Sequence, residues 1–114
     1  MKIFLTGASG MLAAEVIPQL LTHGHTVIQT DLRQRLPEVI GLDILDIQKV
    51  QKLIAKTQPD FVFHLAAETN VDLCEQKPDH AFRTNTLGTE NLAKCCHEKN
   101  LSLLYVSTGS VFSG

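Results

Sequence analysis

The chain has 114 residues, of which 44% are hydrophobic, 19% charged and 5% aromatic. This composition is typical of a globular protein, and the length allows about one domain, which excludes a second full one. Ten basic and twelve acidic residues give a formal net charge of −2 without a basic block. We therefore expect no nucleic-acid partner. No apolar stretch approaches the ~20 residues of a membrane span and no signal peptide is recognisable, so we expect no membrane partner and a cytoplasmic location.

Metal and disulfide chemistry have little support in the sequence. The three cysteines are Cys74, Cys95 and Cys96, an odd number with two adjacent and no Cys-x-x-Cys pair. This pattern favours buried, reduced thiols over a disulfide framework or a zinc site. The five histidines are scattered without His-Glu-x-x-His spacing, so we expect no metal.

Strand and helix patterns alternate in the first part of the chain. An apolar run over residues 2–6 predicts a buried strand. Apolar residues at helical spacing predict a helix over 11–23, which Gly24 ends. Apolar runs at 26–30 and 39–42 predict a second strand and a short third one.

The alternation continues in the second part. Asp46 is suited to cap a helix that runs to about Lys56. A β-branched and aromatic run predicts a fourth strand at 61–65. A long helix follows at 78–99 and a fifth strand at 102–107.

Such alternation with nearly continuous apolar strands predicts a parallel sheet covered on both faces. Right-handed crossovers then give a doubly wound, Rossmann-like α/β fold with strand order 3-2-1-4-5. We expect residues 1–114 to form one such domain.

The turn between the first strand and the first helix is rich in glycine, at residues 6–13. Gly7 permits a tight turn, Gly10 lets the backbone approach a pyrophosphate, and the helix N-terminus offers free N–H groups. Ala13 stands where a third glycine is common, and no Gly-Lys-Ser/Thr follows as in a P-loop. The residues expected to contact a dinucleotide here are Gly7, Ser9, Gly10, Met11 and Leu12.

Asp31 follows the second strand, at the place where a carboxylate accepts hydrogen bonds from an adenosine ribose. Its charge would repel a 2′-phosphate and favours NAD, whereas Arg33 and Arg35 can pair with one and favour NADP. The sequence leaves this choice open, so we expect NAD(P) as cofactor, with Leu32 and Arg33 beside it. The alternative is a plain turn with a solvated aspartate and solvated arginines.

Five segments carry a resemblance to a known family. They are 6–10 (TGASG), 42–46 (LDILD), 64–72 (HLAAETNVD), 85–92 (NTLGTENL) and 106–114 (VSTGSVFSG). With them the chain resembles the N-terminal part of an extended short-chain dehydrogenase/reductase, most closely the dTDP-4-dehydrorhamnose reductase branch.

This resemblance implies further cofactor contacts. Asp43 would accept a hydrogen bond from the adenine amino group and Ile44 would give adenine an apolar face, a helix-entry loop being the alternative. The segment after the fourth strand would pack against the cofactor and continue along its nicotinamide side. The residues concerned are Leu65, Ala66, Ala67, Glu68 and Thr69.

Asn85 shares one helical stripe with Ala81, Gly88, Leu92 and Cys95, so its amide is expected to face the sheet. A buried amide must find hydrogen-bond partners. In the family pattern this asparagine helps to hold active-site backbone or water, and we count it among the cofactor-site residues. A purely structural hydrogen bond is the alternative.

Thr108 matches the catalytic Ser/Thr of the family, whose hydroxyl donates to the substrate carbonyl as alkoxide charge develops. The rhamnose branch usually has an acidic residue next, where this chain has Gly109. The family's proton donor is a tyrosine with a lysine four positions later. The chain's one tyrosine, Tyr105, lies in the fifth strand with Gly109 four positions on, so the pair is absent.

We therefore expect the N-terminal, cofactor-binding part of an oxidoreductase of rhamnose biosynthesis, inactive alone. The full enzyme would transfer hydride from NAD(P)H to C4 of a 4-keto nucleotide sugar. A non-catalytic NAD(P)-binding regulatory subunit and a sugar-nucleotide epimerase or dehydratase are the alternatives. The sequence leaves a homodimer open.

Overall fold

The computed structural model describes residues 1–34, 36–65 and 78–106, with side chains in the last stretch described from residue 86. Strands and helices alternate over these residues as the sequence predicts. The strands are β1 (Lys2–Thr6), β2 (Thr26–Asp31), β3 (Ile40–Gly41), β4 (Phe61–His64) and β5 (Ser102–Tyr105), and the helices are α1 (Met11–Thr22), α2 (Ile47–Thr57) and α4 (Pro78–Lys99).

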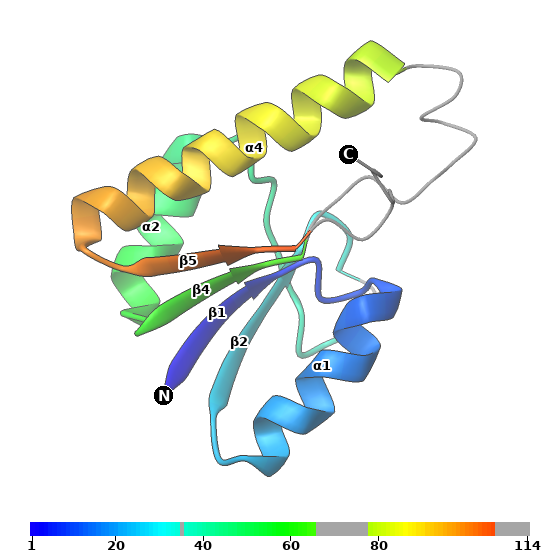
Figure 1. The fold of residues 1–114 in the computed structure, drawn as a ribbon, viewed down its shortest axis with the longest axis vertical. Helices are drawn as coiled ribbons and strands as arrows, with labels where there is room; N and C mark the ends of the chain where they lie inside the picture. Colours follow the sequence, from blue (N-terminus) through cyan, green and yellow to red (C-terminus); the bar gives the residue numbers. More distant parts are fainter. Residues whose placement is uncertain (35, 66–77, 107–114) are drawn as a thin grey trace.

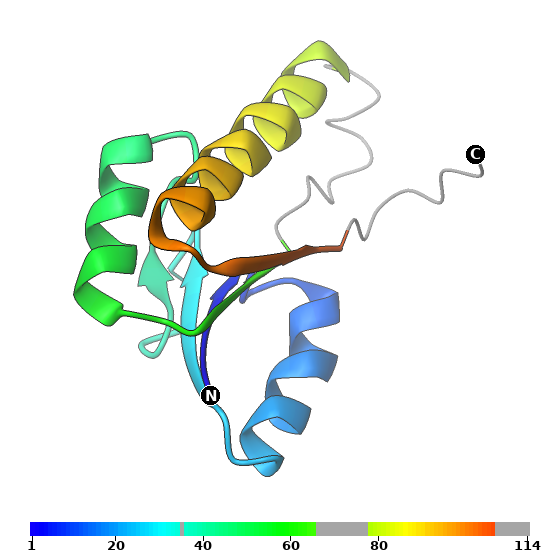
Figure 2. The same ribbon diagram turned by 60° about the vertical axis from the view of Figure 1, so that its left-hand side comes forward.

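The described strands form one sheet in the order β3-β2-β1-β4-β5, and every neighbouring pair is parallel. The predicted doubly wound topology is therefore confirmed. Helix α1 covers one face of the sheet, while α2 and α4 lie side by side on the other (Figures 1 and 2). All carboxyl ends of the strands consequently meet at one edge of the sheet.

The core is divided by the sheet into two layers. Successive strand residues point to opposite faces, so Phe4 of β1 packs toward α2 and α4, whereas Leu5 packs toward α1. Both side chains have no exposed surface. The stripe predicted on α4 is likewise confirmed where its side chains are described, since Leu92 and Cys95 are buried in the first layer.

Local signals set the ends of several elements. Gly24, with φ of 85°, follows the end of α1, and the Asp46 side chain accepts from Lys49 N–H as the predicted N-cap of α2. Strand β3 is shorter than the predicted 39–42, although Leu42 N–H still donates to the Asp31 carbonyl at 2.7 Å. Beyond β5, Val106 N–H continues the ladder to the His64 carbonyl.

The adjacent cysteines confirm the prediction of buried thiols. Cys95 and Cys96 are 1% and 2% exposed and neither is in a disulfide. Burial raises the pKa of both thiols, that of Cys96 to about 11, which leaves little thiolate for reaction. Cys74 lies outside the described residues. Within the described ranges no helix is long and apolar enough to span a membrane.

Candidate dinucleotide-binding site

The glycine-rich turn after β1 is tight. Gly7 has φ of 77°, which disfavours residues with a Cβ, and Gly10 N–H donates to the Gly7 carbonyl at 3.0 Å. A Cβ at Gly10 would come within 3.3 Å of that carbonyl oxygen. The turn therefore brings the backbone round to the start of α1 with no side chain at its two glycines.

The N-terminus of α1 has the form that an anion requires. Gly10 caps the helix with extended backbone and without a side-chain hydrogen bond, and its first turn holds no acidic residue. Within the helix itself, therefore, no carboxylate competes for the first N–H groups and the positive dipole end. The predicted residues Ser9, Met11 and Leu12 lie together here, and the turn fits a pyrophosphate.

Asp31 lies beside this turn, as predicted. Its Oδ2 accepts from Ser9 N–H at 2.8 Å and its Oδ1 from Arg33 N–H at 3.3 Å. Ala8 N–H adds a bond to the Thr30 carbonyl at 3.0 Å. The carboxylate is therefore held in one orientation, while each oxygen keeps a second lone pair for a ribose hydroxyl.

The segment 42–46 continues this edge of the sheet. Asp43 is exposed, and its Oδ1 accepts from Leu45 N–H at 2.9 Å while its carbonyl accepts from Asp46 N–H at 3.0 Å. The bond from Leu42 N–H to the Asp31 carbonyl joins the segment to the end of β2. Asp31 and Asp43, expected at the ribose and adenine, therefore stand on neighbouring backbone.

Two residues of α4 hold this segment, and the sequence did not predict either role. Asn91 Nδ2 donates to the carbonyls of Ile44 at 2.8 Å and Leu45 at 3.2 Å. Gly88 is in such close contact with Ile44 that a Cβ would lie 2.6 Å from its Cγ1 and nearer still to its Cδ1. Gly88 and Asn91 are three positions apart and thus on one helix face. This spacing is the sequence signal from which a shared contact could have been predicted.

A buried polar network lies below the middle of the same edge. His64, at the end of β4, has no exposed surface, and its Nδ1 lies 2.6 Å from Thr6 Oγ1 and its Nε2 3.1 Å from Thr89 Oγ1. The Tyr105 ring stacks on the imidazole at a centroid distance of 4.8 Å. Burial lowers the pKa of His64 to about 4, so the ring is neutral. The network joins the ends of β1, β4 and β5 to α4.

The structure describes only some of the remaining predicted residues. Leu65 is buried in the layer facing α1, and its N–H donates to the Thr6 carbonyl at 3.2 Å, whereas Leu32 and Arg33 are exposed. Asn85 lies in α4 without a described side chain. The predictions for Arg35, Ala66, Ala67, Glu68, Thr69 and Thr108 fall outside the described residues.

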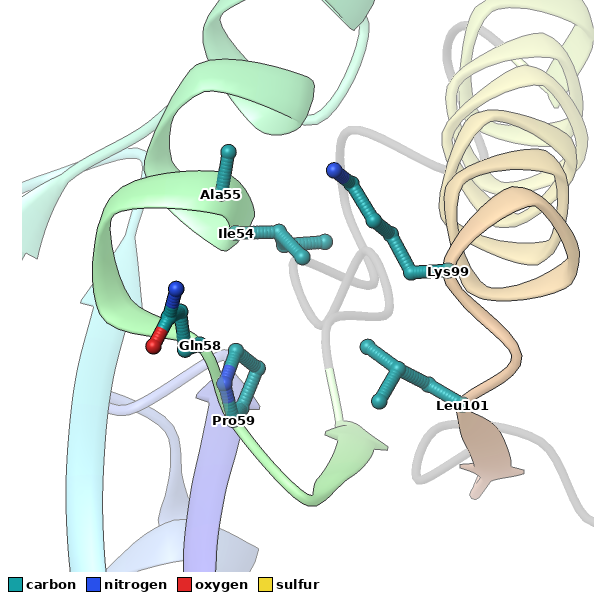
Figure 3. Close-up of a pocket in the computed structure, with 6 residues that line it drawn as sticks. All are labelled: Ile54, Ala55, Gln58, Pro59, Lys99 and Leu101. Carbon is teal, nitrogen blue, oxygen red and sulfur yellow. The ribbon is translucent and has the colours of Figure 1, made fainter.

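Two hollows are lined by described residues. One, of about 500 Å³, extends along α1 from the glycine-rich turn at Ser9 and Gly10 to Pro18 and Leu21. The other, of about 220 Å³, lies at the amino ends of β4 and β5, where the Lys99 side chain extends toward α2 across it (Figure 3). None of the predicted site residues lines the second hollow, which is lined by Ile54, Ala55, Gln58, Pro59, Lys99 and Leu101.

Known proteins are similar to this chain in sequence and in fold. The chain is 35% identical to the dTDP-4-dehydrorhamnose reductase of Mycolicibacterium smegmatis over 97% of its own length and 31% of that protein. It is 32% identical to methionine adenosyltransferase 2 subunit beta of Xenopus tropicalis, covering 99% of the chain and 34% of that protein. The chain therefore spans about a third of the length of these relatives.

A solved structure gives the same fold with a cofactor. The UDP-glucose 4-epimerase of Thermus thermophilus, in complex with NAD, matches 90% of this chain and 36% of its own with a TM-score of 0.80 and 26% identity. This agrees with the prediction of NAD(P) as cofactor. The family model described as RmlD substrate binding domain matches residues 1–114, and the chain belongs to this family.

Proposed function

We propose that this chain is the cofactor-binding part of an oxidoreductase that reduces a keto group of a nucleotide-linked sugar with NAD(P)H. The observation that carries the proposal is the uncapped N-terminus of α1 beside a fixed Asp31 carboxylate at the carboxyl edge of the sheet. A pyrophosphate binds at such a helix N-terminus, and a ribose hydroxyl donates to a carboxylate at the end of the second strand.

In this proposal, different described residues bind the pyrophosphate, the ribose and the adenine of the dinucleotide. Gly7, Ser9 and Gly10, with the first N–H groups of α1 at Met11 and Leu12, bind the pyrophosphate. Asp31 accepts from the adenosine ribose, which favours NAD over NADP because a 2′-phosphate would meet its charge. Asp43 accepts from the adenine amino group through the oxygen that Leu45 N–H leaves free.

The substrate end of the proposal rests on the family resemblance. When bound, the nicotinamide supplies the hydride. Thr108 donates a hydrogen bond to the sugar's keto oxygen and stabilises the developing alkoxide, while Ala66, Ala67, Glu68 and Thr69 line the nicotinamide side. A 4-keto sugar such as dTDP-4-dehydrorhamnose is the proposed substrate class, by likeness to the mycobacterial reductase.

The test uses the full natural chain that contains these residues. NADH and NADPH affinities are measured by titration, and oxidation of each is followed at 340 nm with dTDP-4-dehydrorhamnose. We expect binding and substrate-dependent oxidation, and Thr108→Ala should reduce turnover while leaving cofactor affinity unchanged. Absence of dinucleotide binding would overturn the proposal, and full turnover by Thr108→Ala would overturn the role of Thr108.

A second function is a regulatory subunit that binds NAD(P) without turnover. The 32% sequence identity with methionine adenosyltransferase 2 subunit beta favours this function. Gly109 favours it too, because the rhamnose branch usually has an acidic residue at this position. This alternative predicts dinucleotide binding with no oxidation of NADH or NADPH by the full natural chain. An epimerase would instead convert its sugar with no net oxidation of cofactor.

A further inference from the structure

We propose that Gly88 and Asn91 of α4 are positioning residues for adenine recognition, acting through the segment 42–46. The inference rests on the proposed function, because it assumes that Asp43 meets the adenine of a bound dinucleotide. Neither residue touches the cofactor in this proposal. Their effect is to set where the free oxygen of Asp43 stands.

The first step is the hydrogen-bonding state of the segment. Ile44 and Leu45 precede the N-cap Asp46, so their carbonyls lie outside α2 and have no partner within it. Asn91 Nδ2 donates to both, at 2.8 and 3.2 Å. One amide thus satisfies two consecutive carbonyls that lie 47 and 46 positions away in the sequence.

The second step is steric. Gly88 is buried, and its missing side chain leaves the space in which Ile44 packs, since a Cβ there would lie 2.6 Å from Ile44 Cγ1. This distance is shorter than van der Waals contact, so the Ile44 side chain would have to move to make room for a Cβ. The segment therefore lies close to α4 at Gly88, while Asn91 holds its backbone from the same helix face.

The third step links the segment to Asp43. The carboxylate Oδ1 accepts from Leu45 N–H at 2.9 Å, and the Asp43 carbonyl accepts from Asp46 N–H at 3.0 Å. The peptide units that Asn91 holds are thus the ones that orient the Asp43 side chain. A displacement of residues 44–45 moves the acceptor of the adenine amino group.

The functional consequence concerns the choice of base. An acceptor in a fixed position favours adenine, whose amino group donates, over hypoxanthine, which has a carbonyl oxygen at the same place. When the segment shifts, this discrimination is lost first, because the pyrophosphate and ribose contacts come from other elements. General destabilisation, by contrast, weakens both ligands equally.

The experiment compares two ligands on matched variants of the full natural chain. Dissociation constants are measured for NADH, or NADPH if it binds more tightly, and for the analogue with hypoxanthine in place of adenine. The wild type should prefer adenine about tenfold. Asn91→Leu and Gly88→Ala should reduce this preference to within about twofold, with little change in affinity for the analogue.

Glu90→Gln is the control, since Glu90 is exposed on the same helix, and it should keep the preference. Asn91→Ala, a smaller change, serves if Asn91→Leu does not fold, as judged by its melting curve. Retention of the full preference by folded Asn91 and Gly88 variants would overturn the inference, as would a wild type without preference. A wild type that binds neither dinucleotide would instead overturn the proposed function.

Discussion

On the β2 side of the carboxyl edge the polar groups are accessible and held by backbone donors, whereas beside β4 they are buried and held by other side chains. Asp31 accepts from Ser9 and Arg33 N–H groups. His64 lies between the hydroxyls of Thr6 and Thr89 without any exposed surface. The first arrangement leaves lone pairs for a ligand, while the second uses its polar atoms within the fold.

The two regions should therefore govern different properties of the molecule. A buried polar group without a partner costs far more than an exposed one, so changes at His64 should affect folding first. Changes at the glycine-rich turn or at Asp31 should affect ligand binding with a small effect on folding. Substitutions on each side test this separation.

The largest loss of stability is expected for His64→Ala. It removes a fully buried ring, leaves a cavity and deprives the buried Thr6 hydroxyl of its side-chain partner. The free energy of unfolding should fall by about 3 kcal/mol in urea denaturation. His97→Ala, at an exposed position of α4, is the control and should change it by less than about 0.5 kcal/mol. A loss under about 1 kcal/mol for His64→Ala would contradict the structural role.

The next largest effect is the pH dependence of folding. The pKa of His64 is about 4 in the folded chain against 6.5 as the ordinary value, so the unfolded chain binds the proton first as pH falls. Stability is therefore full above about pH 6.5 and is lost as pH falls toward 4, at about 1.4 kcal/mol per unit. Between pH 7.5 and 5 the loss should reach about 2 kcal/mol.

Urea midpoints of wild type and His64→Asn at the two pH values check this. The variant lacks the titrating ring, so the part of the pH dependence due to His64 should disappear. Identical pH profiles for the two proteins would show that His64 does not carry the effect.

Smaller effects are expected at two glycines that share a backbone conformation. Gly7 and Gly24 have φ of 77° and 85°, so alanine at either costs about 1–2 kcal/mol of stability. Only Gly7 belongs to the turn that fits a pyrophosphate. Gly7→Ala should therefore weaken NADH binding about tenfold or more, whereas Gly24→Ala, with open space around it, should leave the affinity unchanged. If Gly7→Ala and Gly24→Ala bound NADH with equal affinity, the turn would have no part in binding the cofactor.

How much could be predicted from the sequence also differs between the two regions. The turn at Gly7–Gly10 and the position of Asp31 were predictable because each depends on local signals such as apolar runs and glycines. The strand order followed from the alternation of elements and the right-handed crossover rule. The His64–Thr6 contact joins residues 58 positions apart, and the Asn91 contact with Ile44 spans 47. Thr6 and His64 are register partners on the neighbouring strands β1 and β4, so their contact depends on the strand register, whereas the Asn91 contact depends on the packing of α4. Periodicity alone determines neither. The predictions for Thr108 and for residues 66–69 remain predictions.

The smallest effect on stability is expected for Asp31→Ala, and it gives the sharpest contrast with His64. The lost bonds from Ser9 and Arg33 N–H leave these donors accessible to water, so unfolding free energy should fall by under about 1 kcal/mol. The ribose acceptor and the charge that repels a 2′-phosphate disappear together. The preference for NADH over NADPH should therefore fall about tenfold in titrations of the two cofactors. An unchanged preference would contradict the role of Asp31, because the carboxylate would then have no part in reading the ribose.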